Sequence, residues 1–262
     1  MTTLDTSRRP GTRPAVPAGG FRLAFLAMEL RRLLRNRRTL IFALVMPPVF
    51  FVIFGTTSDY RHESFGAGNV TGYVMVSMAV YGAMLATTSG GAMVAVERAV
   101  GWSRQLRLTP LRPPVYIAVK IAVAMVLGLL SVTVVFVLGA VMGARMPASA
   151  WLGCFLIAWL GSLVFAAFGL FMGYLLPSEN VMQVLGPALA LLSFAGGLFL
   201  QLHGWFDTVS KVFPTNGLAV LARAPFAEPS GGAVVLAIVN VVGWAAVFTI
   251  GSAVLFRRDT AR

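Results

Sequence analysis

Few side chains in this 262-residue sequence are of the types that catalyse reactions or bind metal ions. The two histidines, His62 and His203, lie far apart, and neither has the spacing of a zinc site or a catalytic triad. Cys154 is the single cysteine, so it has no partner for a disulfide within the chain, and its apolar surroundings predict a small buried hydrophobe. Lys120 and Lys211 precede isoleucine and valine, which excludes the phosphate-binding loop G-x-x-x-x-G-K-[ST]. The sequence therefore predicts no catalytic residue, no metal site, no bound cofactor and no ATPase site.

The most distinctive polar stretch is residues 96–114, VERAVGWSRQLRLTPLRPP, between two long apolar runs. Trp102 and Leu106 are four residues apart and can share one apolar face, while Pro110 biases Thr109 away from helix. The arginines that surround this face are Arg104, Arg107 and Arg112. Such a surface suits docking to a soluble partner with an acidic rim, since Trp and Arg are favoured in interfaces. A positively charged loop on lipid head groups fits the same residues, so the residues alone leave both interpretations open.

Composition places the chain in a membrane. Hydrophobic residues make up 58% of it and charged residues 11%, with a mean hydropathy of +0.82, whereas a soluble domain carries about 25% charged residues. The net charge of +12 would suggest nucleic acid in a soluble protein, but in a membrane protein the positions of the charges matter more. We therefore expect an integral membrane protein that binds no nucleic acid.

Six apolar runs are long enough to cross a bilayer core, which needs about 20 residues per helix. Because backbone groups in lipid must be satisfied internally, these runs predict an all-α fold with six transmembrane helices. Pro47 and Pro48 should kink or shorten the first helix, and Pro187, Gly196 and Gly197 could break the fifth. The expected spans are residues 39–55, 72–96, 115–143, 151–176, 181–202 and 232–256, with residues 203–231 as an external segment.

Two further elements precede the first span. Residues 1–20 contain three prolines and no apolar core of a signal peptide, which predicts a disordered tail. Residues 21–38 have the period of an amphipathic helix lying in the membrane interface, with leucines in the acyl boundary and arginines toward head groups. The apolar face comprises Leu23, Leu26, Leu30 and Leu33, and the basic side chains are Arg31, Arg32 and Arg35. A simpler alternative is that these arginines only fix the topology.

The distribution of basic residues predicts the orientation. With the amino terminus inside, seventeen Lys and Arg residues fall on the cytoplasmic side and four on the other. Both termini, residues 97–114 and the tail 257–262 are then cytoplasmic. Richness in Arg, Ala and Gly hints at a bacterial genome of high GC content, so we expect a bacterial plasma membrane.

The expected spans are almost free of ionisable residues, with Lys120 near the start of the third as the exception. Ion-coupled carriers usually place such residues within their spans. This weakens the hypothesis of a secondary transporter, and uphill transport would need energy from another subunit.

The polar segment resembles the cytoplasmic segment of ABC transporter permeases of the type-2 exporter family, within which the daunorubicin-resistance-like drug-efflux permeases look closest. The residues that carry the resemblance are Glu97, Arg98, Gly101, Leu106, Arg107, Thr109, Pro110 and Lys120. The resemblance extends over most of the chain and implies that a separate ATP-binding subunit, holding ATP and Mg²⁺, docks on this segment, Trp102 and Arg104 included. Ala99 and Trp102 depart from the family pattern, which has an acidic residue and a threonine there.

The resemblance also implies two permease subunits around a central path lined by the second and fifth helices. The side chains that could line it are Met75, Met78, Met84, Met93, Phe194 and Phe199, and ordinary packing would explain them too. Gly139-x-x-x-Gly143 and Gly169-x-x-x-Gly173 permit close helix contact, within one subunit or between two. The expected function is ATP-driven export of an amphipathic or hydrophobic drug, antibiotic or lipid. A secondary transporter and a non-transporting membrane scaffold are the alternatives.

Overall fold

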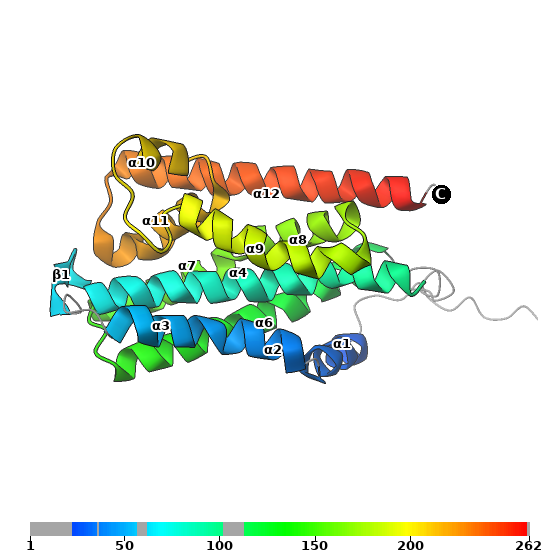
Figure 1. The fold of residues 1–262 in the computed structure, drawn as a ribbon, viewed down its shortest axis with the longest axis horizontal. Coiled ribbons are helices and arrows are strands. Elements are labelled where there is room, and N and C mark those ends of the chain that lie inside the picture. The colour runs from blue at the N-terminus through cyan, green and yellow to red at the C-terminus, as the bar shows by residue number, and fades with distance from the viewer. Residues whose placement is uncertain (1–22, 36, 57–61, 102–112, 261–262) are drawn as a thin grey trace, which may run out of the picture.

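The computed structural model describes residues 23–35, 37–56, 62–101 and 113–260. Helices dominate this part of the chain, and they form an elongated bundle (Figure 1). The helices are α1 (Leu23–Arg35), α2 (Arg37–Leu44), α3 (Met46–Thr56), α4 (Val70–Ala99), α6 (Pro113–Val141), α7 (Ala148–Gly161), α8 (Leu163–Leu175), α9 (Ser178–Ala195), α10 (Trp205–Ser210), α11 (Pro214–Ala227) and α12 (Gly231–Thr260). A two-residue hairpin, β1 (Ser64–Phe65) and β2 (Gly68–Asn69), precedes α4.

Four stretches of the described chain are helical, long and apolar enough to cross a membrane. They are Val70–Ala99, Val115–Val141, Ala148–Leu175 and Gly231–Arg258, the third combining α7 and α8. The first expected span, 39–55, is divided between α2 and α3 just before Pro47 and Pro48, because proline fits the first turn of a helix better than its interior. The fifth expected span, 181–202, corresponds to a shorter helix, since α9 ends at Ala195. Six crossings thus remain a prediction.

Helix α4 is the central element of the bundle, and α6, α8, α3 and α9 all pack against it. Small residues allow this close packing. A Cβ atom on Gly90 would lie 2.5 Å from the Cβ of Ala124 on α6, and one on Gly91 would lie 2.6 Å from the carbonyl oxygen of Ala166 on α8. Glycine at these positions therefore lets three helix backbones approach one another.

Three of the four glycines in the two G-x-x-x-G motifs pack against other helices of the chain. A Cβ on Gly169 would lie 2.2 Å from the carbonyl oxygen of Thr88, and Gly173 lies against Ala92, both on α4. Gly139 accommodates the thioether of Met75. Gly143 has a φ of +93° and closes the end of α6, with no neighbouring atom within 4 Å of its would-be Cβ.

The residues predicted to line a path differ in their burial within the single chain, and the path itself stays a prediction. Met75, Met78 and Met84 are at most 2% exposed and belong to the central hydrophobic core. They are buried because α4, on which they lie, is enclosed by its neighbours. Phe194 is half exposed and contacts the ring of half-buried Phe199, with centroids 4.9 Å apart. Met93 is partly buried, so of the six residues only Phe194 is exposed in this arrangement of the chain.

Helix α12 is the least enclosed of the long helices. It packs mainly on α8 and α11 and runs along one side of the bundle in Figure 1. Large apolar side chains cover its outer face, including Val235, Val239, Val242 and Ile250. An apolar face of this length suits contact with lipid.

Candidate functional site

The structure describes part of the predicted coupling segment. Glu97 and Arg98 lie in the last turn of α4, and Gly101 follows it with a φ of +71°, a conformation that glycine adopts without strain. The remaining predicted contact residues, Trp102, Arg104, Leu106, Arg107, Thr109 and Pro110, lie outside the described residues.

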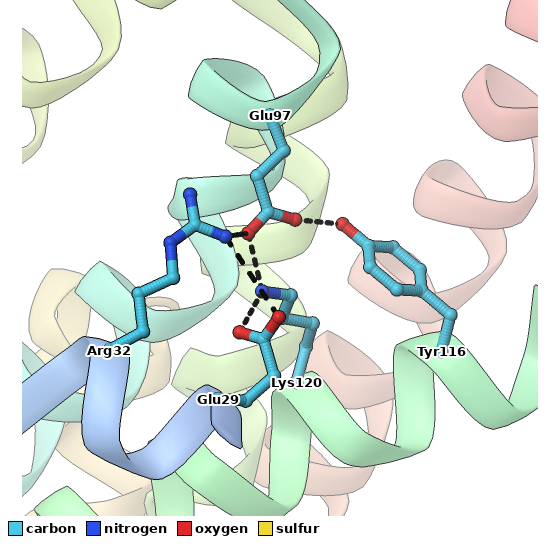
Figure 2. A network of polar contacts seen from close by, with 5 residues as sticks. All are labelled: Glu29, Arg32, Glu97, Tyr116 and Lys120. Carbon is cyan, nitrogen blue, oxygen red and sulfur yellow. Dashed lines mark hydrogen bonds and ion pairs between the residues drawn. The ribbon is translucent and has the colours of Figure 1, made fainter. Parts of the chain in front are cut away.

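Glu97 is the centre of a buried cluster of charges, which Figure 2 shows from close by. Its Oε1 accepts hydrogen bonds from Arg32 Nη1 at 2.8 Å and from Lys120 Nζ at 2.5 Å. The hydroxyl of Tyr116 donates to its Oε2. Lys120 Nζ also donates to Oε2 of Glu29 at 2.5 Å. One buried lysine thus bridges two buried carboxylates, and we call these five residues the charge cluster.

The charge cluster joins three helices that are distant in sequence. Glu29 and Arg32 come from α1, Glu97 from α4, and Tyr116 and Lys120 from α6. Spacings of three residues on α1 and four on α6 place each pair on one face of its helix. Glu29, Glu97 and Lys120 are each no more than 4% exposed. Burial of such charges is costly, and the charge-assisted hydrogen bonds offset it only while all partners are present.

Helix α1 is also held by apolar contacts. Leu26 and Leu30 pack against a cluster on neighbouring helices that includes Ala43, Val119 and Val123. These two half-buried leucines therefore contact neighbouring helices of the same chain, and Glu29 between them binds Lys120. The position of α1 in the membrane interface stays a prediction. On the outer surface of α1 lie the exposed Arg31 and Arg35, while the side chains of Leu23 and Leu33 are outside the described set.

Arg98 holds a fourth helix. Its Nη1 donates to the carbonyl oxygens of Gly173 and Tyr174, at 3.1 and 3.2 Å, at the carboxyl end of α8. The guanidinium also lies 5.5 Å from the centroid of the Tyr174 ring. A cation at a helix C-terminus is favoured by the unpaired carbonyls there.

Glu97 and Arg98 make contacts within their own chain, and their role in binding a partner stays a prediction. We expected both to face a partner protein, but in the structure both bind side chains or carbonyls of their own chain. They fix the end of α4 from which the chain continues into residues 102–112.

A pocket of about 270 Å³ opens beside the cluster. It is lined by Glu29, Arg32, Arg35, Gly90, Met93, Glu97, Lys120 and Val123. The described residues contain no group of three or more His, Cys, Asp or Glu that could hold a metal ion, and His62 and His203 are exposed. The chemistry of this end of the bundle is therefore ion pairing between helices.

Sequence reasoning missed Glu29 and Tyr116. A signal for Glu29 was present, because it is the one acidic residue in 21–38 and its spacing places it on the leucine face with Leu26, Leu30 and Leu33. An acid on an apolar face predicts a buried cationic partner. Tyr116 carried no comparable signal, since tyrosine is common near the ends of membrane helices.

Comparison with known proteins identifies the family of this fold. The family model described as ABC-2 type transporter matches residues 23–224. The chain belongs to the ABC-2 type transporter family. This ABC-2 permease is also similar to YvfS of Bacillus subtilis (strain 168), a protein named for transport permease function, at 29% identity over 187 residues that cover 70% of this chain and 75% of YvfS.

The family match spans the whole charge cluster. It begins at residue 23, the start of α1, and includes α4 and α6, whereas α12 lies beyond its end. The chain is therefore a membrane protein of a transport family, and its charge cluster is built from residues within the matched range.

Proposed function

We propose that this ABC-2 permease is the membrane-spanning subunit of an ATP-driven exporter in a bacterial plasma membrane. Energy comes from a separate ATP-binding subunit that holds ATP and Mg²⁺ and docks on residues 97–114 from the cytoplasm. Two permease subunits, identical or related, enclose the transport path. The exported compound is amphipathic or hydrophobic, such as a drug, an antibiotic or a lipid.

The charge cluster carries this proposal. It joins α1, α4 and α6 at the two places where the chain enters and leaves the coupling segment, since α4 ends at Ala99 and α6 begins at Pro113. A force applied to residues 102–112 would reach both helices, and the ion pairs make α1 move with them. A buried ion-pair cluster with several partners gives the rigid connection that such transmission needs.

The mechanism follows from two-state physics. Binding of ATP closes the two ATP-binding subunits, and their closure favours one packing of the permease helices over another. A ligand shifts such an equilibrium only by its differential affinity for the two states. The charge cluster and the contact of Arg98 with α8 join α1, α4, α6 and α8. When ATP favours one packing, these four helices tilt together as one unit.

Copurification from native membranes tests the proposal. Wild type is compared with Arg104→Glu/Arg107→Glu, which inverts charge in the coupling segment, and with Arg258→Glu, an exposed residue near the end of α12, as the matched control. We expect an ATP-binding subunit to copurify with wild type and with the control but not with the double variant. Mass spectrometry identifies the bound proteins, and ATPase assays follow the activity.

Three outcomes would contradict the proposal. Absence of any ATP-binding protein from the wild-type sample would remove its basis. Transport that survives ATP depletion but follows the proton gradient would indicate a secondary transporter. Binding of a partner without transport and without a change in ATPase rate would indicate a scaffold.

A further inference from the structure

A second pocket lies at the opposite end of the bundle from the charge cluster. Figure 1 places β1, α10 and α11 at one end of the molecule and α1 at the other. The pocket has a volume of about 300 Å³. Its wall includes the rings of Phe65 and Tyr73 and the polar side chains of Gln201, His203, Asn216 and Arg223. Nothing in the proposed coupling mechanism uses this pocket.

Arg223 on α11 is the buried cation of this pocket, with 8% of its surface exposed. Its Nη2 donates to Ser77 Oγ at 2.7 Å and to the carbonyl oxygen of Leu198 at 2.6 Å. Its Nη1 donates to the carbonyl oxygen of Gly197 at 3.5 Å, and the guanidinium stacks 4.0 Å from the Tyr73 ring centroid. All of these partners are neutral, so the charge itself is not compensated by them.

The donors of Arg223 are not all used. Nε is buried and has no hydrogen-bond partner among the described residues, and Nη1 has a second N–H beyond its long bond to Gly197. Among the described residues, no carboxylate forms an ion pair with Arg223. The acid that lines the same pocket, Asp207, is paired with Lys211 at 2.8 Å.

A buried guanidinium without an anion is energetically unusual. Burial lowers the pKa of Arg223, which shows that the site penalises the charged form, but arginine does not lose its proton in proteins. Buried charges are normally paired, since the cost of removing them from water is large. An anion in the adjoining pocket would supply the missing charge.

We propose that the pocket between β1, α10 and α11 binds an oxyanion, a phosphate or carboxylate group, through Arg223. The planar fork of arginine matches both groups. Gln201 supplies a further hydrogen-bond donor, and Phe65 and Tyr73, whose ring centroids are 4.6 Å apart, give an apolar wall for an attached carbon chain. The oxyanion belongs to a lipid head group or to a free ion, and the chemistry of recognition is the same.

Binding to the purified full-length protein in neutral detergent tests this site. Thermal unfolding is followed during titration with inorganic phosphate, with chloride at equal ionic strength as reference, and separately with phosphatidylglycerol against phosphatidylcholine. Arg223→Gln removes the charge, and Gln201→Trp fills the pocket while Arg223 stays in place. Arg145→Gln is the matched control, because Arg145 is exposed and does not line the pocket.

We expect phosphate or phosphatidylglycerol to raise the midpoint of wild type and of Arg145→Gln by several degrees, and to leave Gln201→Trp and Arg223→Gln unchanged. A shift with phosphate indicates a free ion as ligand, and a shift with phosphatidylglycerol alone indicates a lipid head group. If Arg223→Gln does not fold, Gln201→Trp alone decides the question. Equal shifts in all variants, or no shift in wild type with either probe, would overturn the proposal.

One acid of this chain could take the place of a ligand. Asp59 precedes the hairpin and lies outside the described residues. If wild type shows no shift while Asp59→Asn gains one, the counter-charge of Arg223 is Asp59 itself, and the pocket is not a site for external anions.

Discussion

At the scale of single residues, Glu97 and Arg223 are the two buried charges that the predictions concern, one at each end of the bundle. Glu97 is surrounded by two cations and a hydroxyl, whereas Arg223 is surrounded by neutral acceptors. The first is a satisfied structural charge and the second an unsatisfied one. Replacing Glu97 should therefore lower the stability of the fold, whereas replacing Arg223 should abolish binding of the anion.

Glu97→Gln is predicted to destabilise the permease by about 3 kcal/mol, because its loss leaves the buried Lys120 with insufficient counter-charge. Unfolding in mixed micelles, followed by circular dichroism, measures the effect. Glu179→Gln is the control, since Glu179 is exposed on α9 and the change there should stay within about 0.5 kcal/mol. Equal stability of the two variants would show that the charge cluster contributes nothing.

Lys120→Met combined with Glu97→Gln is predicted to cost less than the two single changes added together. Glu97→Gln leaves Lys120 without one of its carboxylate partners, and Lys120→Met leaves Glu97 without its buried cation. The double change removes both of these charges at once. The double-mutant cycle uses the same unfolding measurement, with a coupling of about 1 kcal/mol or more expected. Additive effects would contradict a direct interaction between the two side chains.

At the scale of elements, small residues decide which helices approach closely. Gly169 of α8 lies against Thr88 of α4, and Thr88 Oγ1 donates to the carbonyl oxygen of Phe165 at 3.2 Å. The α4–α8 contact is thus a close backbone contact reinforced by a side-chain hydrogen bond. The sequence motif Gly169-x-x-x-Gly173 serves this contact within the chain.

Gly169→Ala is predicted to lower the stability by about 1–3 kcal/mol through overpacking, because its Cβ would meet a backbone oxygen that cannot move aside. Gly243→Ala is the matched control in α12, where no atom lies within 4 Å of the added Cβ. That variant should be as stable as wild type or slightly more stable, since alanine favours helix. Thermal midpoints in one detergent separate the two cases, and a tolerated alanine at position 169 would refute the close contact.

Leu30→Ala is predicted to loosen α1. Loss of the half-buried leucine should cost about 1.4 kcal/mol and raise the hydrogen-exchange rate of α1 amides about tenfold. Met28→Ala is the control, because Met28 is half exposed and lies outside the cluster that Leu30 joins. Exchange that is unchanged in Leu30→Ala would indicate that lipid, and not the protein, holds this face.

At the scale of the whole molecule, burial varies strongly between the long helices. Of the most apolar 18-residue window, 83% of residues are buried in α4 and 11% in α12. The central α4 has the lower mean hydropathy, 1.5, and the peripheral α12 the higher, 2.4. The outer surface of the bundle is therefore apolar over most of its length, as a lipid-facing surface must be.

The predicted topology places Arg145 outside the cell and Arg258 inside. In a Cys154→Ala background, Arg145→Cys should react with a membrane-impermeant maleimide in intact cells, and Arg258→Cys should react only after permeabilisation. Both native side chains are exposed, so access is set by the membrane alone. Labelling of both positions in intact cells would contradict the three crossings predicted between Arg145 and Arg258.

The sequence by itself determined the class of protein, because composition and long apolar runs require a helical membrane protein whatever the packing. Glu97, Arg98 and Lys120 were also among the residues that carry the family resemblance, and the family match agrees with that resemblance. Only the tertiary structure decided that Glu97 turns inward to Arg32, Lys120 and Tyr116, and that Leu26 and Leu30 pack on protein. Spacing along a helix fixes which side chains share a face, but not what that face meets. That depends on contacts between residues far apart in the chain, and the same limit explains why Met75 was expected to line a path and lies in the core.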